Sequence, residues 1–130
     1  AYELEKRFPD FWNKQKANKS LGSLRKFGIE DKASGSDLIQ RMRHTIRPVI
    51  PVKAIPRDTD KYTRVSDILG YIESGHVMLP DSAPWVHDFI AECEAFTSDD
   101  AHDHDDQIDP MCDAISDMLH NGRVSVKDIL

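Results

Sequence analysis

Carboxylate side chains gather near the C-terminal end of this 130-residue chain, where the sequence runs His104-Asp105-Asp106-Gln107-Ile108-Asp109. Apolar residues recur there at steps of three and four, which predicts one face of a helix. They are Ile108, Met111, Cys112, Ile115 and Leu119. Four aspartates at the same spacing fall on the opposite side, where like charges repel. They are Asp105, Asp106, Asp109 and Asp113. Such a cluster suits a divalent cation, or is simply an acidic first turn and a solvated face.

A second acidic pair, Glu30 and Asp31, directly follows residues 24–29, which predict a short strand. A turn containing Gly35 comes next, and then a helix with Ser34 or Ser36 available as its cap. Residues 46–55 predict another strand, so this β-α-β order implies a parallel pair with a right-handed crossover. Acids at the carboxyl end of such a strand lie where ligand-binding sites of α/β sheets are found. They are equally well explained as polar residues of a loop.

The remaining pattern predicts helices over residues 2–18, 62–74 and from Asp81 onward, the last with Trp85 facing inward. Pro9 either kinks the first helix or begins it. Residues 123–130 form a short amphipathic tail that pairs as a strand or docks. The chain is 39% apolar and 31% charged and has no membrane-length apolar run, which predicts one soluble domain over residues 1–130. Its two cysteines match no metal or redox spacing.

The net charge of −6 conceals an asymmetry. Residues 1–65 carry 15 Lys and Arg against 8 Asp and Glu, a net of +7. Residues 66–130 carry 2 against 15, a net of −13. A basic half attracts polyanions, and an acidic half repels them unless metal ions intervene. The combination suits a metal-dependent phosphodiesterase, or two halves that simply attract each other.

Three segments stand in a distinctive order. The first is Ile29-Glu30-Asp31-Lys32-Ala33-Ser34-Gly35. The second leads from Asp60-Lys61 and Arg64 into Gly75-His76-Val77-Met78-Leu79-Pro80 and Ala83-Pro84-Trp85, and the third is the acidic segment 104–109. Together they resemble the C-terminal nuclease domain of the large terminase subunit of tailed bacteriophages and prophages. The resemblance extends over nearly the whole chain.

This resemblance implies an α/β, RNase H-like nuclease fold with a small mixed sheet flanked by helices. The fold's first strands, and the aspartate that the family carries on the first of them, would precede residue 1. The implied function is a Mg²⁺- or Mn²⁺-dependent endonuclease with a two-metal site, which cuts concatemeric viral DNA during packaging. The implied partners are double-stranded DNA, the terminase small subunit and the portal protein, in the cytoplasm of the bacterial host and away from membranes.

The resemblance also assigns roles to individual residues. Glu30, Asp105 and Asp106 are expected to be catalytic carboxylates and metal ligands, and Asp31 and Asp109 are further candidate ligands. Which of Asp105 and Asp106 is the principal ligand stays open. Lys32, Lys61 and Arg64 are candidate phosphate contacts, and His104 is a candidate for orienting a ligand or a water. If the last helix begins at Asp109, beside Pro110, then Asp105 and Asp106 are loop ligands.

Two other functions compete with the nuclease. One is a non-catalytic, degenerate prophage fragment that binds DNA or a partner, which the absent first-strand acid and the basic half favour. The other is a small structural metal site built from His102, His104 and nearby aspartates, because imidazoles beside carboxylates bind transition metals. Metal preference separates the last function from the nuclease.

Overall fold

The computed structural model of this chain describes residues 2–20, 22–96 and 106–120. The chain divides into two compact units, residues 1–58 and 59–130, and each has its own apolar core. The first unit is α/β and the second is helical among the described residues. By formal charge, unit 1 carries 13 Lys and Arg against 7 Asp and Glu, and unit 2 carries 4 against 16. The charge asymmetry of the sequence therefore coincides with the division into units.

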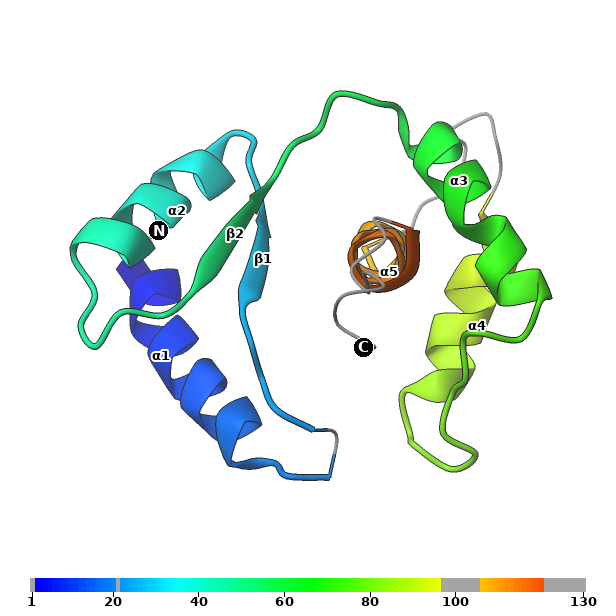
Figure 1. Cartoon of the computed structure of the whole chain (residues 1–130), viewed down its shortest axis with the longest axis horizontal. Coiled ribbons are helices and arrows are strands. Elements are labelled where there is room, and N and C mark those ends of the chain that lie inside the picture. Colours follow the sequence, from blue (N-terminus) through cyan, green and yellow to red (C-terminus); the bar gives the residue numbers. More distant parts are fainter. Residues whose placement is uncertain (1, 21, 97–105, 121–130) are drawn as a thin grey trace, which may run out of the picture. The chain divides into compact units, whose positions relative to one another are not determined.

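Unit 1 contains a parallel pair of strands with two helices on one of its faces (Figure 1). The elements follow in the order α1 (Tyr2–Ala17), β1 (Phe27–Glu30), α2 (Ser34–His44) and β2 (Val52–Ile55). In the register of the pair, Phe27 lies opposite Val52 and Glu30 lies opposite Ile55. The parallel pair expected from the β-α-β pattern is confirmed. α1 runs through Pro9 without a break in its assigned range.

Apolar side chains from all four elements hold unit 1 together. The buried residues are Trp12, Ile29, Leu38, Ile39, Met42 and Ile50. The ring of Phe27 lies 5.2–5.6 Å, centroid to centroid, from three rings of α1. A short two-stranded sheet is marginal by itself, so this packing is what fixes the strands and their carboxyl ends.

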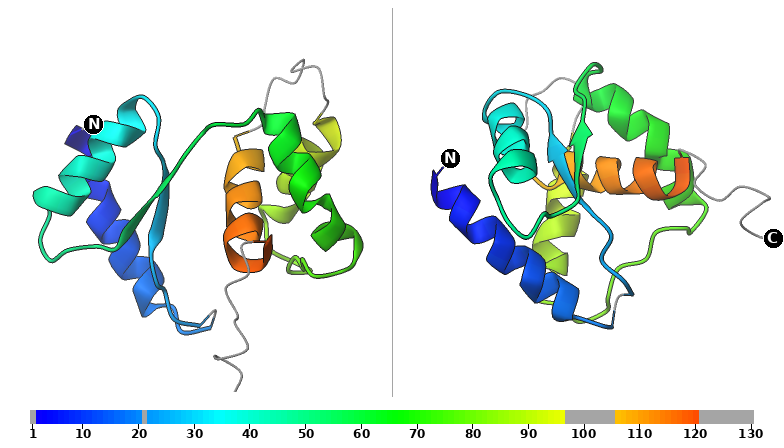
Figure 2. Two further views of the ribbon diagram at one scale, coloured as in Figure 1. Left: turned by 45° about the horizontal axis from the view of Figure 1, so that its top comes forward. Right: turned by 60° about the vertical axis from the view of Figure 1, so that its left-hand side comes forward.

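In its described ranges, 59–96 and 106–120, unit 2 has three helices followed by a π-helical segment (Figure 2). They are α3 (Lys61–Glu73), α4 (Val86–Ala95), α5 (Ile108–Ile115) and η1 (Ser116–His120). α3 begins at an N-cap, Asp60, whose carboxylate accepts a hydrogen bond from the Thr63 backbone at 2.8 Å. It ends before Gly75, whose φ of +81° suits glycine.

The predicted apolar face of the last helix is largely confirmed, because Ile108, Cys112 and Ile115 are buried with Ile68 of α3. Leu119 is 37% exposed, and Trp85, expected to face inward, is 50% exposed. The expectation for Trp85 was therefore wrong. The tail 123–130 lies outside the described residues. No helix in the described ranges combines the length and apolarity needed to cross a bilayer.

Candidate functional site

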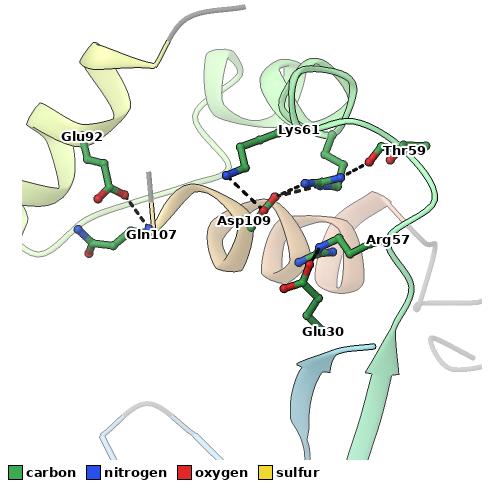
Figure 3. Close-up of polar contacts among 8 residues, drawn as sticks. Glu30, Arg57, Thr59, Lys61, Glu92, Gln107 and Asp109 are labelled. Atoms are coloured by element: carbon green, nitrogen blue, oxygen red, sulfur yellow. Dashed lines mark hydrogen bonds and ion pairs between the residues drawn. The ribbon is translucent and has the colours of Figure 1, made fainter. Parts of the chain in front are cut away.

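Glu30 is the last residue of β1, and its carboxylate is held by an arginine from beyond the neighbouring strand (Figure 3). Nε of Arg57 donates to Oε1 of Glu30 over 3.0 Å. The parallel register explains this pair, because Glu30 lies opposite Ile55, two residues before Arg57. The Arg57 side chain is 7% exposed and that of Glu30 is 48% exposed. Glu30 is thus an oriented carboxylate that solvent and ions can reach.

The turn after β1 is shaped by a close approach of two backbone segments. A Cβ at Gly35 would overlap the carbonyl oxygen of Glu30, so only glycine fits there. The expected serine cap of α2 was wrong, since no side chain caps its first turn. Instead, Oγ of Ser36 donates to Oδ1 of the neighbouring acid, Asp31, over 2.7 Å. The exposed Lys32 belongs to the same turn.

Asp109 has very different surroundings, in the first turn of α5. Its Oδ1 accepts a hydrogen bond from Nε of Arg64 at 2.9 Å and forms an ion pair with Nη2 of the same guanidinium at 2.8 Å. Nζ of Lys61 lies 3.5 Å from Oδ2 (Figure 3). Arg64 also donates to the carbonyl oxygen of Thr59. The three charged side chains are only 17–22% exposed, so they join α3 to α5 in a partly buried ionic cluster.

The residues just before α5 are held by α4. The backbone N–H of Gln107 donates to Oε2 of Glu92 over 2.7 Å, which satisfies one of the free amides at the start of the helix (Figure 3). α5 begins at Ile108, so Asp106 lies in the turn before it and is exposed. Asp106 is therefore a loop residue, the alternative that Pro110 raised. His104 and Asp105, and also His102, lie outside the described residues.

The candidate metal ligands can be tested for fit on their donors. Glu30, Asp31, Asp106 and Asp109 all offer the carboxylate oxygens that Mg²⁺ and Mn²⁺ prefer. Among the residues that the structure describes, however, no three His, Cys, Asp or Glu side chains come together as a metal site. The cation of Arg57 beside Glu30, and the two cations on Asp109, also oppose a further positive charge at these acids. The donors are of the right kind, but the described part does not complete a metal centre.

Two of the expected phosphate contacts, Lys61 and Arg64, meet an expected metal ligand instead of standing apart. The pairing of Arg64 with Asp109 was not predicted from the sequence, because nothing local links residues that are 45 positions apart. The contact of Arg57 with Glu30 was not predicted either. The sequence did contain a signal for the contact of Arg57, because residues just beyond the carboxyl ends of two parallel strands lie at the same edge of the sheet.

A comparison with protein families identifies the family of this chain. The sequence model described as "Terminase RNaseH-like domain" matches residues 6–127. The chain therefore belongs to this family, and its fold class is RNase H-like. It is a nuclease-type domain of the terminase kind, as the resemblance of the sequence implied. No curated protein and no solved structure matches the chain.

Proposed function

We propose that this chain is the DNA-cutting portion of a terminase and hydrolyses phosphodiester bonds of double-stranded DNA with Mg²⁺ or Mn²⁺. Glu30, Asp105 and Asp106 are its catalytic carboxylates. The observation that carries the proposal is the position of Glu30 in a chain of this family, at the carboxyl end of a parallel strand. In this setting the terminase small subunit and the portal protein are its partners, in the cytoplasm of the bacterial host.

The environment of Glu30 supports a functional role more than a structural one. A half-exposed carboxylate contributes little to stability through an ion pair. Arg57, by contrast, is nearly buried and has its guanidinium directed at that carboxylate. Such a donor fixes the orientation of an acid that must meet a substrate or an ion. Bound metal ions would supply charge stabilisation at the reacting phosphate, and Arg57 would keep Glu30 in place.

The charge of unit 1 supports DNA as the substrate. Its excess of six positive charges provides the sequence-independent attraction that phosphates exert on Lys and Arg. Lys32 is exposed beside the candidate acids Glu30 and Asp31 and is the first choice for a phosphate contact. Lys61 and Arg64 already neutralise Asp109, which makes them weaker candidates.

A second function follows from a specific observation. Because the described carboxylates do not assemble as a metal centre, a non-catalytic fragment that binds DNA through unit 1 also fits. The two functions share DNA binding and differ in bond cleavage. Only the nuclease function requires both Glu30 and Asp106, and it requires them for cleavage of the DNA backbone.

The test is nicking of supercoiled plasmid by the whole chain with Mn²⁺, with Mg²⁺ and with EDTA. Glu30→Gln and Asp106→Asn are compared with Asp37→Asn, an exposed acid on α2 that lies outside the proposed set. We expect metal-dependent nicking by the parent and by Asp37→Asn. Both acid variants should lose at least about a hundredfold in rate, since a metal-ion site supplies several kcal/mol of transition-state stabilisation. DNA binding without any nicking would support the second function.

A further inference from the structure

Unit 2 contains a groove with almost entirely apolar walls. Its volume is about 350 Å³, and α3, the segment that follows it, α4 and the start of α5 form its walls. The lining includes Leu69, Ile72, Leu79, Ile90, Cys93 and Met111. Among the residues that the structure describes, Glu94 is the one charged residue that lines it.

Several of these walls are open to solvent. Leu69 is 42% exposed, Ile90 is 41% exposed, and Ile72 and Leu79 are 36% and 38% exposed. Single exposed apolar residues are ordinary on a protein surface, but a contiguous concave group of them marks a binding surface. The groove therefore suits a short segment with aliphatic side chains.

The charged residues of unit 2 indicate which kind of segment binds in the groove. In the described part of unit 2, residues 59–96 and 106–120, eleven Asp and Glu accompany only two cations, Lys61 and Arg64. Both of these contact Asp109. With Glu94 in the wall, the groove favours a segment that brings positive charge along with its apolar side chains.

The chain itself carries such a segment. Residues 123–130 read Arg-Val-Ser-Val-Lys-Asp-Ile-Leu, so half of them are aliphatic. Arg123 and Lys127 are the only Lys or Arg residues after Arg64. The family match also continues to residue 127, beyond the end of η1.

The end of η1 lies close enough to the groove. Nδ1 of His120 is 3.2 Å from Oη of Tyr71 on α3. The next residue of that helix, Ile72, lines the groove. The ten residues after His120 span at most about 33–36 Å when extended, which is ample for a cavity of this size. We propose that residues 123–130 bind in the apolar groove between α3 and α4, with their aliphatic side chains against its walls.

Cys93 provides a direct reporter, because it is one of the residues that line the groove. The other cysteine, Cys112, is 2% exposed, and burial raises the pKa of its thiol to about 11, so its alkylation reports unfolding in the same sample. The rate of Cys93 alkylation by N-ethylmaleimide at pH 8 is measured by peptide mass spectrometry in the full-length chain. The double variant Val124→Asp/Val126→Asp is compared with Ser125→Asp, which adds a charge at a polar position of the same segment.

If the segment occupies the groove about nine-tenths of the time, the double variant should react about tenfold faster, because labelling follows the open population. Ser125→Asp should react like the parent. A synthetic peptide of residues 121–130, added to the double variant, should restore protection in a saturable manner. Equal rates of Cys93 alkylation in the parent and the double variant would overturn the proposal. Either another part of the chain would then cover the groove, or nothing would. Protection that grows with chain concentration would also overturn it, because a second copy would then be the occupant.

A groove substitution completes the test. Ile90→Asp should prevent the peptide from protecting Cys93 in the double-variant background. Leu4→Asp, which changes a similarly exposed apolar residue of unit 1, should leave that protection unchanged. Equal peptide protection in the Ile90→Asp and Leu4→Asp chains would contradict binding in this groove.

Discussion

Glu30 in unit 1 and Asp109 in unit 2 were both expected to be metal ligands, yet their environments differ. Glu30 is half exposed and meets Arg57, whereas Asp109 is about one-fifth exposed and meets both Arg64 and Lys61. A carboxylate that faces solvent remains accessible to an ion or a phosphate. One that is enclosed by two cations mainly connects the helices that carry them. The contacts therefore favour a functional role for Glu30 and a structural one for Asp109.

The largest expected stability effect concerns the backbone around Glu30. Gly35→Ala should destabilise unit 1 by about 3 kcal/mol, because the new Cβ would meet the backbone oxygen of Glu30 and α2 would have to shift. Gly70→Ala is the matched control, since nothing lies within 4 Å of a Cβ there and alanine suits the interior of α3. It should stabilise unit 2 by about 0.5–1 kcal/mol.

Urea unfolding monitored by fluorescence measures the first of these changes, because Trp12 is buried in unit 1 while Trp85 in unit 2 is half exposed. Hydrogen exchange in peptides of α3 measures the second. Equal stability of Gly35→Ala and the parent would show that the turn after β1 does not constrain the position of Glu30.

The next effect tests the ionic cluster. Asp109→Asn should destabilise unit 2 by about 2 kcal/mol, because it removes hydrogen bonds to a charged group and leaves two partly buried cations without their carboxylate. Asp106→Asn, at an exposed position before α5, should change stability by less than about 0.5 kcal/mol. Hydrogen exchange of α3 and α5 is the measurement. Similar exchange rates in both variants would remove the structural role assigned to Asp109.

If the chain binds DNA as proposed, the lysines of the two units should contribute differently to the affinity. Lys32→Gln should lower the slope of log K against log salt by about 1, the value of one lost phosphate contact. Lys61→Gln should leave the slope unchanged, because Lys61 lies beside Asp109. Fluorescence anisotropy with a labelled duplex at several salt concentrations measures both. A larger loss for Lys61 than for Lys32 would reverse this assignment.

The smallest effect is a pH dependence at the start of α3. Hydrogen bonds from the backbone and the hydroxyl of Thr63 hold the pKa of Asp60 below its ordinary value of 3.8. A lowered folded-state pKa means that this stabilisation is complete above pH 3.8 and is lost as the pH falls through the lowered value. Asp60→Ala should therefore be less stable than the parent at pH 7 and should approach it in acid. A difference that does not change with pH would show that the ionised carboxylate is not what stabilises this helix.

These contrasts show what sequence patterns can predict here. Apolar periodicity located α2, α3 and α5, and strand–helix–strand order predicted the parallel pair that places Glu30 at a sheet edge. The prediction of a serine cap for α2 was wrong because the hydroxyl of Ser36 has a competing partner, Asp31, in the preceding turn. The prediction that Trp85 is buried was wrong because a regular apolar spacing does not tell which end of a helix stays exposed to solvent.

The ion pairs needed three-dimensional information. Arg57 lies 27 positions from Glu30, and Arg64 lies 45 positions from Asp109. A sequence shows that such residues carry opposite charges, but many other pairs in a chain with 31% charged residues do so as well. Only packing selects among them. The same limit applies to the groove of unit 2, whose walls come from separate helices.

Plasmid nicking by Glu30→Gln and Asp109→Asn, side by side with the parent in Mn²⁺, tests the central contrast most directly. We expect the parent to nick and Glu30→Gln to be folded but to lose at least about a hundredfold in rate, the several kcal/mol that a metal site supplies. Asp109→Asn should keep most of the activity at temperatures where unit 2 is still folded. Undiminished nicking by Glu30→Gln, together with loss of nicking by a folded Asp109→Asn, would contradict the functional role of Glu30 and the structural role of Asp109.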